Sequence, residues 1–370
     1  MKCFALFLAL AGLSLPCFAV TADGAMWNSA DKENSGYITL EEIRSFYKFM
    51  PIAQPRDRAG RAVGNGTVTL IFGPAPAELS IHGLRCELSH PTRSDDKGDL
   101  LVSRTDLLKL IDPVLRPTYI TNRRPVRTVI IDPGHGGHDP GTVTDSIRES
   151  NVVLMVAGKL AAELKKRGME VQLTREDNRH LSDQFRVDMA ARAENAVFIS
   201  LHLNKGRSDM RGAETYTAAP AEPGEEVRPV NEHDAANAAL AVALQAAMVH
   251  RAEAKDGGCR RSRYSLLNSL SCPAALVELG YATHPEEAEL LSSDEYQNRL
   301  ALALADGIST FAGVMNPETQ LKALPPPPPP PAEPAKVDAP VKKADTGNKK
   351  ASPRKRRPAA RKKSDSRRRK

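Results

Sequence analysis

The sequence predicts an α/β protein whose main domain has a mostly parallel, six-stranded sheet with helices on both faces. Short apolar runs that are typical of buried strands alternate along the chain with longer segments whose apolar residues recur at helical spacing. This alternation favours parallel strands, because each helix returns the chain across a face of the sheet. Of the 370 residues, 41% are hydrophobic but only 5% are aromatic, which predicts a core of Ala, Val, Leu and Ile.

Composition divides the chain into four segments. Residues 1–19 combine a basic start, an apolar run and small residues at the expected cleavage position, as in a secretory signal peptide. Residues 25–118 are expected to form a small α+β domain and residues 125–315 the main domain, joined by a linker rich in Pro and Arg over residues 113–127. Residues 325–370 begin with seven prolines and become strongly basic, which predicts a disordered tail. The mature chain has no segment apolar enough to span a bilayer.

In the main domain the expected elements alternate throughout. The apolar stripe of Val152, Val156 and Leu160, for example, has the spacing of one face of a helix. The expected strands cover residues 127–131, 169–173, 197–201, 214–217, 264–267 and 274–279. The expected helices cover residues 150–167, 181–194, 235–252 and 295–311.

The small domain is expected to contain a helix with Leu40, Ile43 and Tyr47 on its apolar side. Strands are expected over residues 67–72, 78–81 and 100–102, and a short helix over residues 106–111. The stretch Asp31–Glu42 also matches the spacing of an EF-hand calcium loop. A polar turn followed by a strand and a helix is the alternative, and the sequence does not decide between them.

Three cysteines remain after removal of the signal peptide, namely Cys86, Cys259 and Cys272. An odd number excludes a dense disulfide framework. Cys259 and Cys272 are candidates for a disulfide in an oxidising compartment, although their separation in sequence does not establish their geometry.

A histidine in a glycine-rich loop follows the first apolar run of the main domain. Residues 129–131 predict a buried strand, and Gly134, Gly136 and Gly137 surround His135 just after it. Glycine permits backbone conformations closed to other residues and lets a ligand approach closely. Because open α/β sheets keep their sites at the carboxyl ends of strands, this loop is a candidate site. A polar turn is the alternative.

Three further residues lie where they could join this histidine. Glu149 begins the first long helix, where the helix dipole favours a carboxylate, and by itself it would be interpreted as a capping acid. His202 follows a predicted strand, where a lone histidine is usually structural. Glu278 lies inside an apolar run, and a carboxylate is costly to bury there unless it is paired or used. Two histidines, one carboxylate ligand and a further acid are what a hydrolytic zinc site needs.

Four motifs in chain order resemble the zinc-dependent N-acetylmuramoyl-L-alanine amidases of type 3: IIDPGHGGHDPG, RESNVVL, FISLHLN and ALVELGY. The likeness covers about residues 127–313. The resemblance implies a fold similar to zinc amidases and carboxypeptidases. It also implies that His135, Glu149 and His202 bind Zn²⁺ and that Glu278 is the catalytic acid and base.

The substrate implied by the resemblance is peptidoglycan, cut at the amide between N-acetylmuramic acid and the L-alanine of the stem peptide. Two alternatives stay open, a zinc peptidase acting within the stem peptide and a non-catalytic protein that binds the cell wall. The signal-like start predicts export to the periplasm, the cell wall or the extracellular space. Residues 332–370 hold 16 Lys or Arg against 4 Asp or Glu. Export argues against nucleic acid as the partner of this tail and favours anionic envelope polymers.

Overall fold

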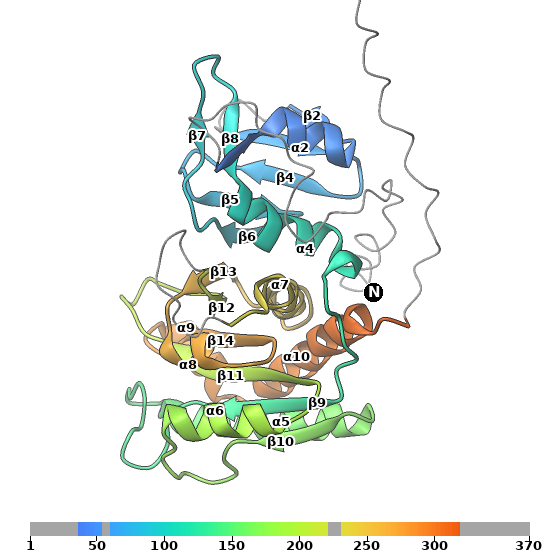
Figure 1. Cartoon of the computed structure of the whole chain (residues 1–370). Helices are drawn as coiled ribbons and strands as arrows, with labels where there is room; N and C mark the ends of the chain where they lie inside the picture. Colours follow the sequence, from blue (N-terminus) through green and yellow to red (C-terminus); the bar gives the residue numbers. More distant parts are fainter. Residues whose placement is uncertain (1–35, 54–59, 221–230, 319–370) are drawn as a thin grey trace, which may run out of the picture. The chain divides into compact units, whose positions relative to one another are not determined.

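A computed structural model describes residues 36–53, 60–220 and 231–318 (Figure 1). The predicted signal peptide, the first residues of the calcium-loop match and the basic tail lie outside these residues. Among the helices that are described, none is long and apolar enough to cross a membrane.

The main domain has a six-stranded sheet that is parallel except at one pairing (Figure 1). Its strands are β9 (Thr128–Pro133), β10 (Glu170–Leu173), β11 (Ala196–Asn204), β12 (Ala213–Ala218), β13 (Asp256–Ser262) and β14 (Ala274–Tyr281). The order is β10-β9-β11-β14-β12-β13, and only β12 and β14 are antiparallel neighbours. The prediction of a mostly parallel six-stranded sheet is confirmed.

The same sheet continues into the N-terminal region, which the sequence did not predict. Its added strands form an antiparallel series in the order β6-β5-β4-β3-β2. They are β2 (Met50–Ile52), β3 (Arg61–Gly64), β4 (Thr69–Phe72), β5 (Glu78–Ile81) and β6 (Leu84–Glu87). The junction between the two parts is the parallel pairing of β6 with β13, whose register is given by Cys86 and Cys259 alone.

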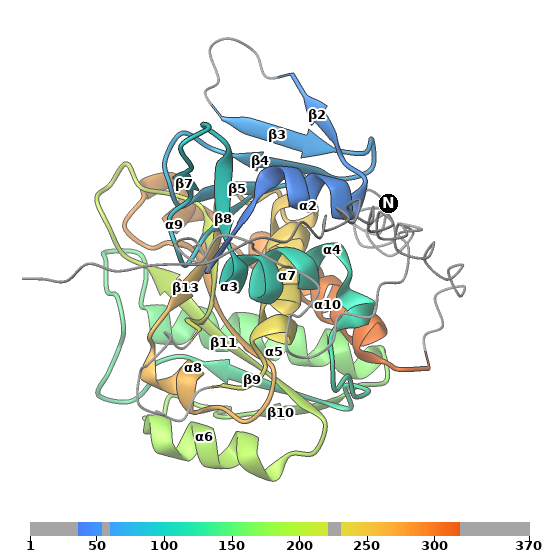
Figure 2. The ribbon, with the colours of Figure 1, turned by 45° about the horizontal axis from the view of Figure 1, so that its top comes forward.

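Helices cover both faces of the six-stranded part, as predicted (Figures 1 and 2). They are α5 (Glu149–Lys166), α6 (Asp183–Arg192), α7 (Asp234–Arg251), α8 (Ser265–Ser269), α9 (Pro285–Ser292) and α10 (Asp294–Met315). Successive side chains of β9 point to opposite faces of the sheet, because side chains alternate along a strand. Val129 and Ile131 pack in the core with α5, α7 and α10, whereas Ile130 packs in the core with α6 and α8.

Helix α7 is buried on most of its surface because it belongs to two cores. Leu240 and Leu244 pack with the sheet, α5 and α10. Ala238, Val242 and Ala246 instead pack with the N-terminal region and with Cys259. The many alanines of this helix suit a position between two packed layers, because their small side chains let both sides approach.

The N-terminal region also contains a second, three-stranded sheet and several short helices. Helix α2 begins with a capping box, in which the Thr39 side chain accepts from Glu42 N and the Glu42 carboxylate accepts from Thr39 N at 2.9 Å. Glu42 would be the last ligand of the calcium-loop match. These elements are β1 (Tyr37–Thr39), α2 (Leu40–Tyr47), β7 (Arg93–Ser94), β8 (Leu100–Ser103), α3 (Arg104–Asp106), the π-helix η1 (Leu107–Ile111), α4 (Asp112–Leu115) and the 3₁₀ helix η2 (Pro117–Tyr119).

Three expectations are wrong. Residues 264–267 do not form a strand but enter helix α8, and the true strand, β13, lies just before them. Two glycines and four polar residues gave β13 no apolar alternation in the sequence. The expected linker over residues 113–127 is partly structured, because Val114 and Leu115 are buried in the N-terminal core.

Cys86, Cys259 and Cys272 are all free thiols in the structure. The candidate disulfide between Cys259 and Cys272 is the third error, because these two cysteines pack in different cores. Cys259 packs with the N-terminal region and α7, whereas Cys272 packs in the core with α6 and α8. The two side chains therefore lie on opposite faces of the sheet.

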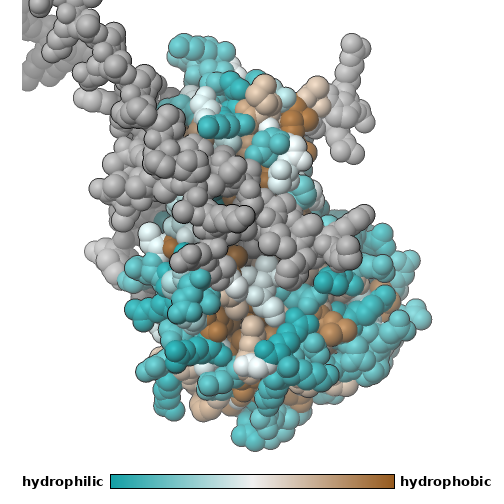
Figure 3. Space-filling model, turned by 90° about the vertical axis from the view of Figure 1, so that its right-hand side faces the viewer, coloured by the Kyte–Doolittle hydropathy of each residue, from teal (hydrophilic) through white to brown (hydrophobic). Residues whose placement is uncertain are grey.

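On the face drawn in Figure 3, the apolar residues that are not grey form small separate groups among hydrophilic ones.

Candidate active site

Two glycines make room for the histidine and glutamate side chains beyond β9. His135 itself adopts a left-handed backbone conformation, with φ of 61°. A Cβ at Gly134 would lie 2.2 Å from the ring of His202. A Cβ at Gly141 would lie 2.7 Å from both the Glu149 carboxylate and the His135 ring, and its φ of 67° disfavours other residues. Glycine is therefore required where the three side chains converge.

His135, Glu149 and His202 form a cluster that could hold a metal ion. Glu149 Oε1 lies 3.0 Å from His135 Nε2 and 3.2 Å from His202 Nδ1, and the two ring nitrogens lie 3.2 Å apart. Ligands ~2.0–2.1 Å from a tetrahedral zinc ion would be ~3.3 Å apart. Two imidazole nitrogens and one carboxylate oxygen are also the donor set of catalytic zinc sites. The residues present thus fit such an ion in both chemistry and spacing.

Hydrogen bonds around the cluster orient its side chains. His135 Nδ1 lies 2.8 Å from Asp139 Oδ2, which favours a proton on Nδ1 and leaves the lone pair of Nε2 facing the cluster. The Glu149 carboxylate accepts from Leu203 N at 2.9 Å and from Thr142 N at 2.7 Å. Each oxygen of the Glu149 carboxylate therefore accepts a backbone hydrogen bond, which is more than helix capping requires.

Contacts within the cluster shift the pKa values of His135 and Glu149. Burial opposes charge on His135, but the hydrogen bond and charge of Glu149 outweigh it and raise the pKa of His135 to about 9. Burial likewise opposes the charge of Glu149, but His135 and His202 hold the pKa of its carboxyl well below the usual range. Without a metal ion, the raised pKa of His135 and the lowered pKa of Glu149 favour an ion pair between a protonated His135 and the Glu149 carboxylate. A bound cation would take the place of that proton.

Arg175 ties the glycine-rich loop to the start of α5. Its buried guanidinium donates to Pro133 O at 2.9 Å, Gly134 O at 2.7 Å and Ser150 O at 2.8 Å. One side chain therefore fixes the two backbone segments that carry His135 and Glu149. Because a guanidinium has five donors in a rigid fork, lysine could not make the same set of bonds.

Asp132, like Arg175, connects separate segments of the chain near the cluster. Its buried carboxylate accepts from Thr174 Oγ1 at 2.6 Å and Ser200 Oγ at 2.7 Å, and it pairs with the buried guanidinium of Arg186. These contacts link β9 to β11 and to α6. Both oxygens are occupied, so Asp132 serves the structure and has no free oxygen for chemistry.

Glu278 lies opposite His202 in the parallel pairing of β14 with β11. Its Oε2 is buried and has no hydrogen-bond partner among the described residues. Burial raises the pKa of Glu278 to about 7, an effect opposed by His202 and reinforced by Glu149 and Glu214. A carboxyl group that is half-protonated near neutral pH can both accept and donate a proton.

Glu214 is the antiparallel partner of Glu278 on β12 and is also buried. Its carboxylate has four donors, of which one lies on β12 itself and one on each of β11, β13 and β14. They are Asn204 Nδ2 at 2.9 Å, Tyr216 OH at 2.7 Å, Tyr281 OH at 3.3 Å and Arg260 Nη2 at 3.0 Å. These donors hold the Glu214 carboxylate in place beside Glu278.

The structure brings together the residues that the sequence singled out, but sequence reasoning missed two of their supports. Asp139 follows His135 by four residues, and this short spacing could have identified it. Arg260 was missed because its strand was not recognised. His138, the other histidine of the loop, is not part of the cluster and instead lies with its ring centroid 4.1 Å from that of His180.

Comparison with known proteins places this site in a family context. The family model described as N-acetylmuramoyl-L-alanine amidase (Amidase_3) matches residues 129–310. The chain is 32% identical over 185 residues to YqiI of Bacillus subtilis (strain 168), an uncharacterized protein, and this match covers 50% of this chain and 84% of YqiI.

Two further matches carry a described activity. LytC of Bacillus subtilis (strain 168), an N-acetylmuramoyl-L-alanine amidase, is 28% identical over 186 residues, which is 50% of this chain and 35% of LytC. The catalytic domain of CwlV, an N-acetylmuramoyl-L-alanine amidase from Bacillus (Paenibacillus) polymyxa var. colistinus, is 31% identical with a TM-score of 0.44. That match covers 51% of this chain and 99% of the CwlV domain.

Proposed function

The chain belongs to the N-acetylmuramoyl-L-alanine amidase family and is a peptidoglycan amidase, and we propose that Glu278 and a His-Glu-His zinc site carry this activity. The bond cut is the amide between N-acetylmuramic acid and the L-alanine of the stem peptide. The observation that supports the mechanism best is a buried, unpartnered Glu278 oxygen beside the three-residue cluster.

The ligands in this proposal are His135, Glu149 and His202. They supply three protein atoms, the number typical of zinc sites that do chemistry. When bound, zinc supplies Lewis-acid chemistry that polarises a carbonyl and makes water nucleophilic near neutral pH. Asp139 holds His135 in the tautomer that ligation needs, because its carboxylate accepts the Nδ1 proton.

Glu278 transfers the proton. Its unprotonated carboxylate takes a proton from the attacking water, and the resulting acid gives it to the nitrogen of the L-alanine leaving group. A pKa of about 7 suits both halves of this transfer, because neither form is strongly favoured at neutral pH. Glu214 cannot share this role, since both of its oxygens already accept hydrogen bonds.

Digestion of purified peptidoglycan, followed by mass analysis of the products, tests the function. We expect glycan with free lactyl groups and released stem peptides, and we expect a chelator to stop the reaction. Shortened peptides still attached to glycan would instead indicate a zinc peptidase. No products with metal-loaded protein would indicate a wall-binding protein.

His135→Ala tests the metal assignment, with His138→Ala as the matched control. The two histidines occupy the same loop, but only His135 belongs to the cluster. We expect His135→Ala to lose zinc and hydrolysis together and His138→Ala to keep both. Stoichiometric zinc in His135→Ala would overturn the ligand set.

We also propose roles for the segments that flank the catalytic region. The N-terminal segment contributes no residue to the His-Glu-His cluster and packs against α7, which supports a structural or targeting role. Residues 1–19 would direct export, in keeping with a substrate outside the cytoplasm. The basic tail would hold the enzyme near anionic envelope polymers by an attraction that salt screens. Deleting residues 325–370 should then weaken sedimentation with envelopes at low salt and leave cleavage of small soluble substrates unchanged.

A further inference from the structure

The junction between the N-terminal strands and the catalytic sheet places two cysteines side by side. Cys86 of β6 and Cys259 of β13 are direct partners in the only register given for this strand pair. Neighbouring strands lie ~4.7–4.9 Å apart, which is within the Cα separation of ~4.4–6.8 Å found in disulfides. The backbone is held close here, because Arg85 N donates to Asp256 Oδ2 at 2.8 Å.

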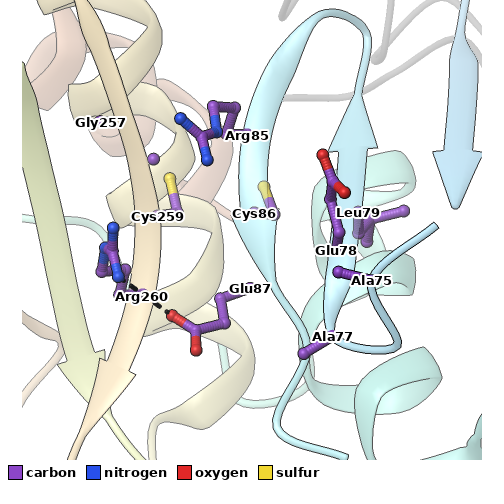
Figure 4. Close-up of a pocket in the computed structure, with 11 residues that line it drawn as sticks. Ala75, Ala77, Glu78, Leu79, Arg85, Cys86, Glu87, Gly257, Cys259 and Arg260 are labelled. Atoms are coloured by element: carbon purple, nitrogen blue, oxygen red, sulfur yellow. Dashed lines mark ion pairs between the residues drawn. The ribbon is translucent and has the colours of Figure 1, made fainter. Parts of the chain in front are cut away.

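The two thiols also face the same way. Figure 4 shows both sulfur atoms on the same side of adjacent strands. Both side chains are buried in the core that joins the N-terminal region to α7, and the Cys86 side chain hydrogen-bonds the Cys259 thiol. That contact, together with burial, raises the pKa of Cys259 well above its usual range. The Cys259 thiol therefore ionises less readily than an exposed thiol, and exchange requires a thiolate.

A cavity of about 280 Å³ reaches both cysteines from outside. It is lined on one side by β5 and β6 and on the other by β13, so it lies along the junction (Figure 4). Arg260 spans the cavity wall, pairing with Glu87 at 3.5 Å and with Glu214 at 3.0 Å. The junction is thus connected through Arg260 to the carboxylate that flanks Glu278.

We propose that Cys86 and Cys259 form a disulfide that joins the N-terminal region to the catalytic sheet, with Cys272 left as a free thiol. The inference rests on the proposed export, because an oxidising compartment is where such bonds persist. A metal site explains the adjacent cysteines less well, since the one group of metal-ligating residues found among the described residues is the His135 cluster.

The oxidant is an organic disulfide, and the step is balanced. The thiolate of one cysteine attacks a sulfur of the organic disulfide, which releases one thiol and leaves a mixed disulfide. The second cysteine then attacks the protein sulfur of the mixed disulfide and releases the other thiol. Two protein thiols are oxidised to one disulfide, and the organic disulfide is reduced to two thiols that carry the protons.

The bond would add a covalent link to a junction that otherwise rests on a short strand contact and on packing against α7. It closes a long loop of chain, which restricts the unfolded ensemble. It would also keep β13, and with it Arg260, in place beside Glu214. Because the native thiols are buried, we expect the bond to form readily while the chain folds and slowly afterwards.

Disulfide mapping on the full chain tests the proposal without measuring hydrolysis, so it can fail independently of the proposed function. Cys3 and Cys17, which lie in the predicted signal peptide, are first changed to Ser. The reduced chain is refolded with bis(2-hydroxyethyl) disulfide, its free thiols are alkylated in denaturant, and the peptides are identified by mass. A peptide pair linked through Cys86 and Cys259, with Cys272 alkylated, is the expected result.

Alkylation of both Cys86 and Cys259, or a link to Cys272, would overturn the proposal. Cys272→Ser is the matched control and should keep the Cys86–Cys259 link. A second readout is thermal unfolding, in which oxidation should raise the Tm by roughly 5–10 °C. The same treatment should leave the Tm of Cys86→Ser unchanged, and an equal rise in that variant would contradict the assignment. A chain that does not refold is mapped as purified from an oxidising compartment, with the same two outcomes.

Discussion

Two carboxylates of one sheet, Asp132 on β9 and Glu278 on β14, differ in what surrounds them. Asp132 at the end of β9 accepts from Thr174 and Ser200 and pairs with Arg186. Glu278 on β14 is partly buried, and its buried Oε2 has no partner among the described residues. Both positions are costly for a charge, but only Asp132 is compensated by its neighbours.

In the proposed mechanism, this difference distinguishes Asp132, which stabilises the fold, from Glu278, which transfers a proton. A carboxylate whose hydrogen bonds are complete gains nothing by taking a proton, whereas a buried carboxylate without partners exchanges one near neutral pH. The two acids should therefore respond in opposite ways when they are neutralised. Loss of charge at Asp132 should weaken the fold, and loss of charge at Glu278 should weaken catalysis only.

The largest expected effect is on turnover. Glu278→Gln should lower kcat by ~10²–10⁴-fold, because general acid–base catalysis is removed while the ligand set stays intact. Zinc content, measured by atomic absorption, should be unchanged. Glu286→Gln on the exposed surface of α9 is the control and should keep full activity. Loss of zinc in Glu278→Gln would show that Glu278 is a ligand instead.

The next largest effect is on folding. Asp132→Asn keeps the shape of the side chain but leaves the buried Arg186 charge without its partner, which should cost ~3–5 kcal/mol of stability. Chemical denaturation measures this change. Asp177→Asn, which removes the partner of Arg179 at an exposed site, should change the midpoint little. Equal denaturation midpoints for the two variants would show that the contacts of Asp132 do not stabilise the fold.

The stability of the metal-free protein should depend on pH through Glu278. Its folded pKa of about 7 lies above the ordinary glutamate value of 4.5, so the folded state binds the proton more tightly than the unfolded state does. Stability contributed by this group is thus lost as pH rises from about 4.5 to about 7. Above pH 7, Glu278→Gln should be more stable than the natural chain by ~3 kcal/mol, and the difference should disappear near pH 4.5. A difference that grows toward low pH would contradict the burial argument.

A smaller effect is expected next to the ligands. Asp139→Ala removes the acceptor that orients His135, and loss of such a support typically lowers metal affinity by ~10–100-fold. Competition with a chelating dye measures this affinity. Asp145→Ala in the same loop region is the control and should bind zinc normally. An unchanged affinity in Asp139→Ala would mean that the loop backbone alone orients the histidine.

The sequence by itself determined the elements with strong local signals. Apolar runs located β9, β11 and β14, and helical spacing located α5, α7 and α10 to within a few residues. It also located His135, Glu149 and His202 at strand and helix ends, where parallel strands bring their carboxyl ends to one edge, and Glu278 inside an apolar strand. These predictions succeeded because each depends on residues that are close together in the chain.

Only the tertiary structure decided what depends on distant contacts. Strand β13 lacks an apolar pattern, and it is a strand because β12 and β6 supply hydrogen-bonding partners on either side. The same pairing puts Cys259 beside Cys86 and Arg260 beside Glu214, neither of which has a signal in local spacing. Likewise, Asp132 and Glu278 both stand in or after apolar runs, and only the donors brought by other strands and helices distinguish them. Hydrogen-bond partners far apart in sequence are set by register and packing, which local periodicity does not encode.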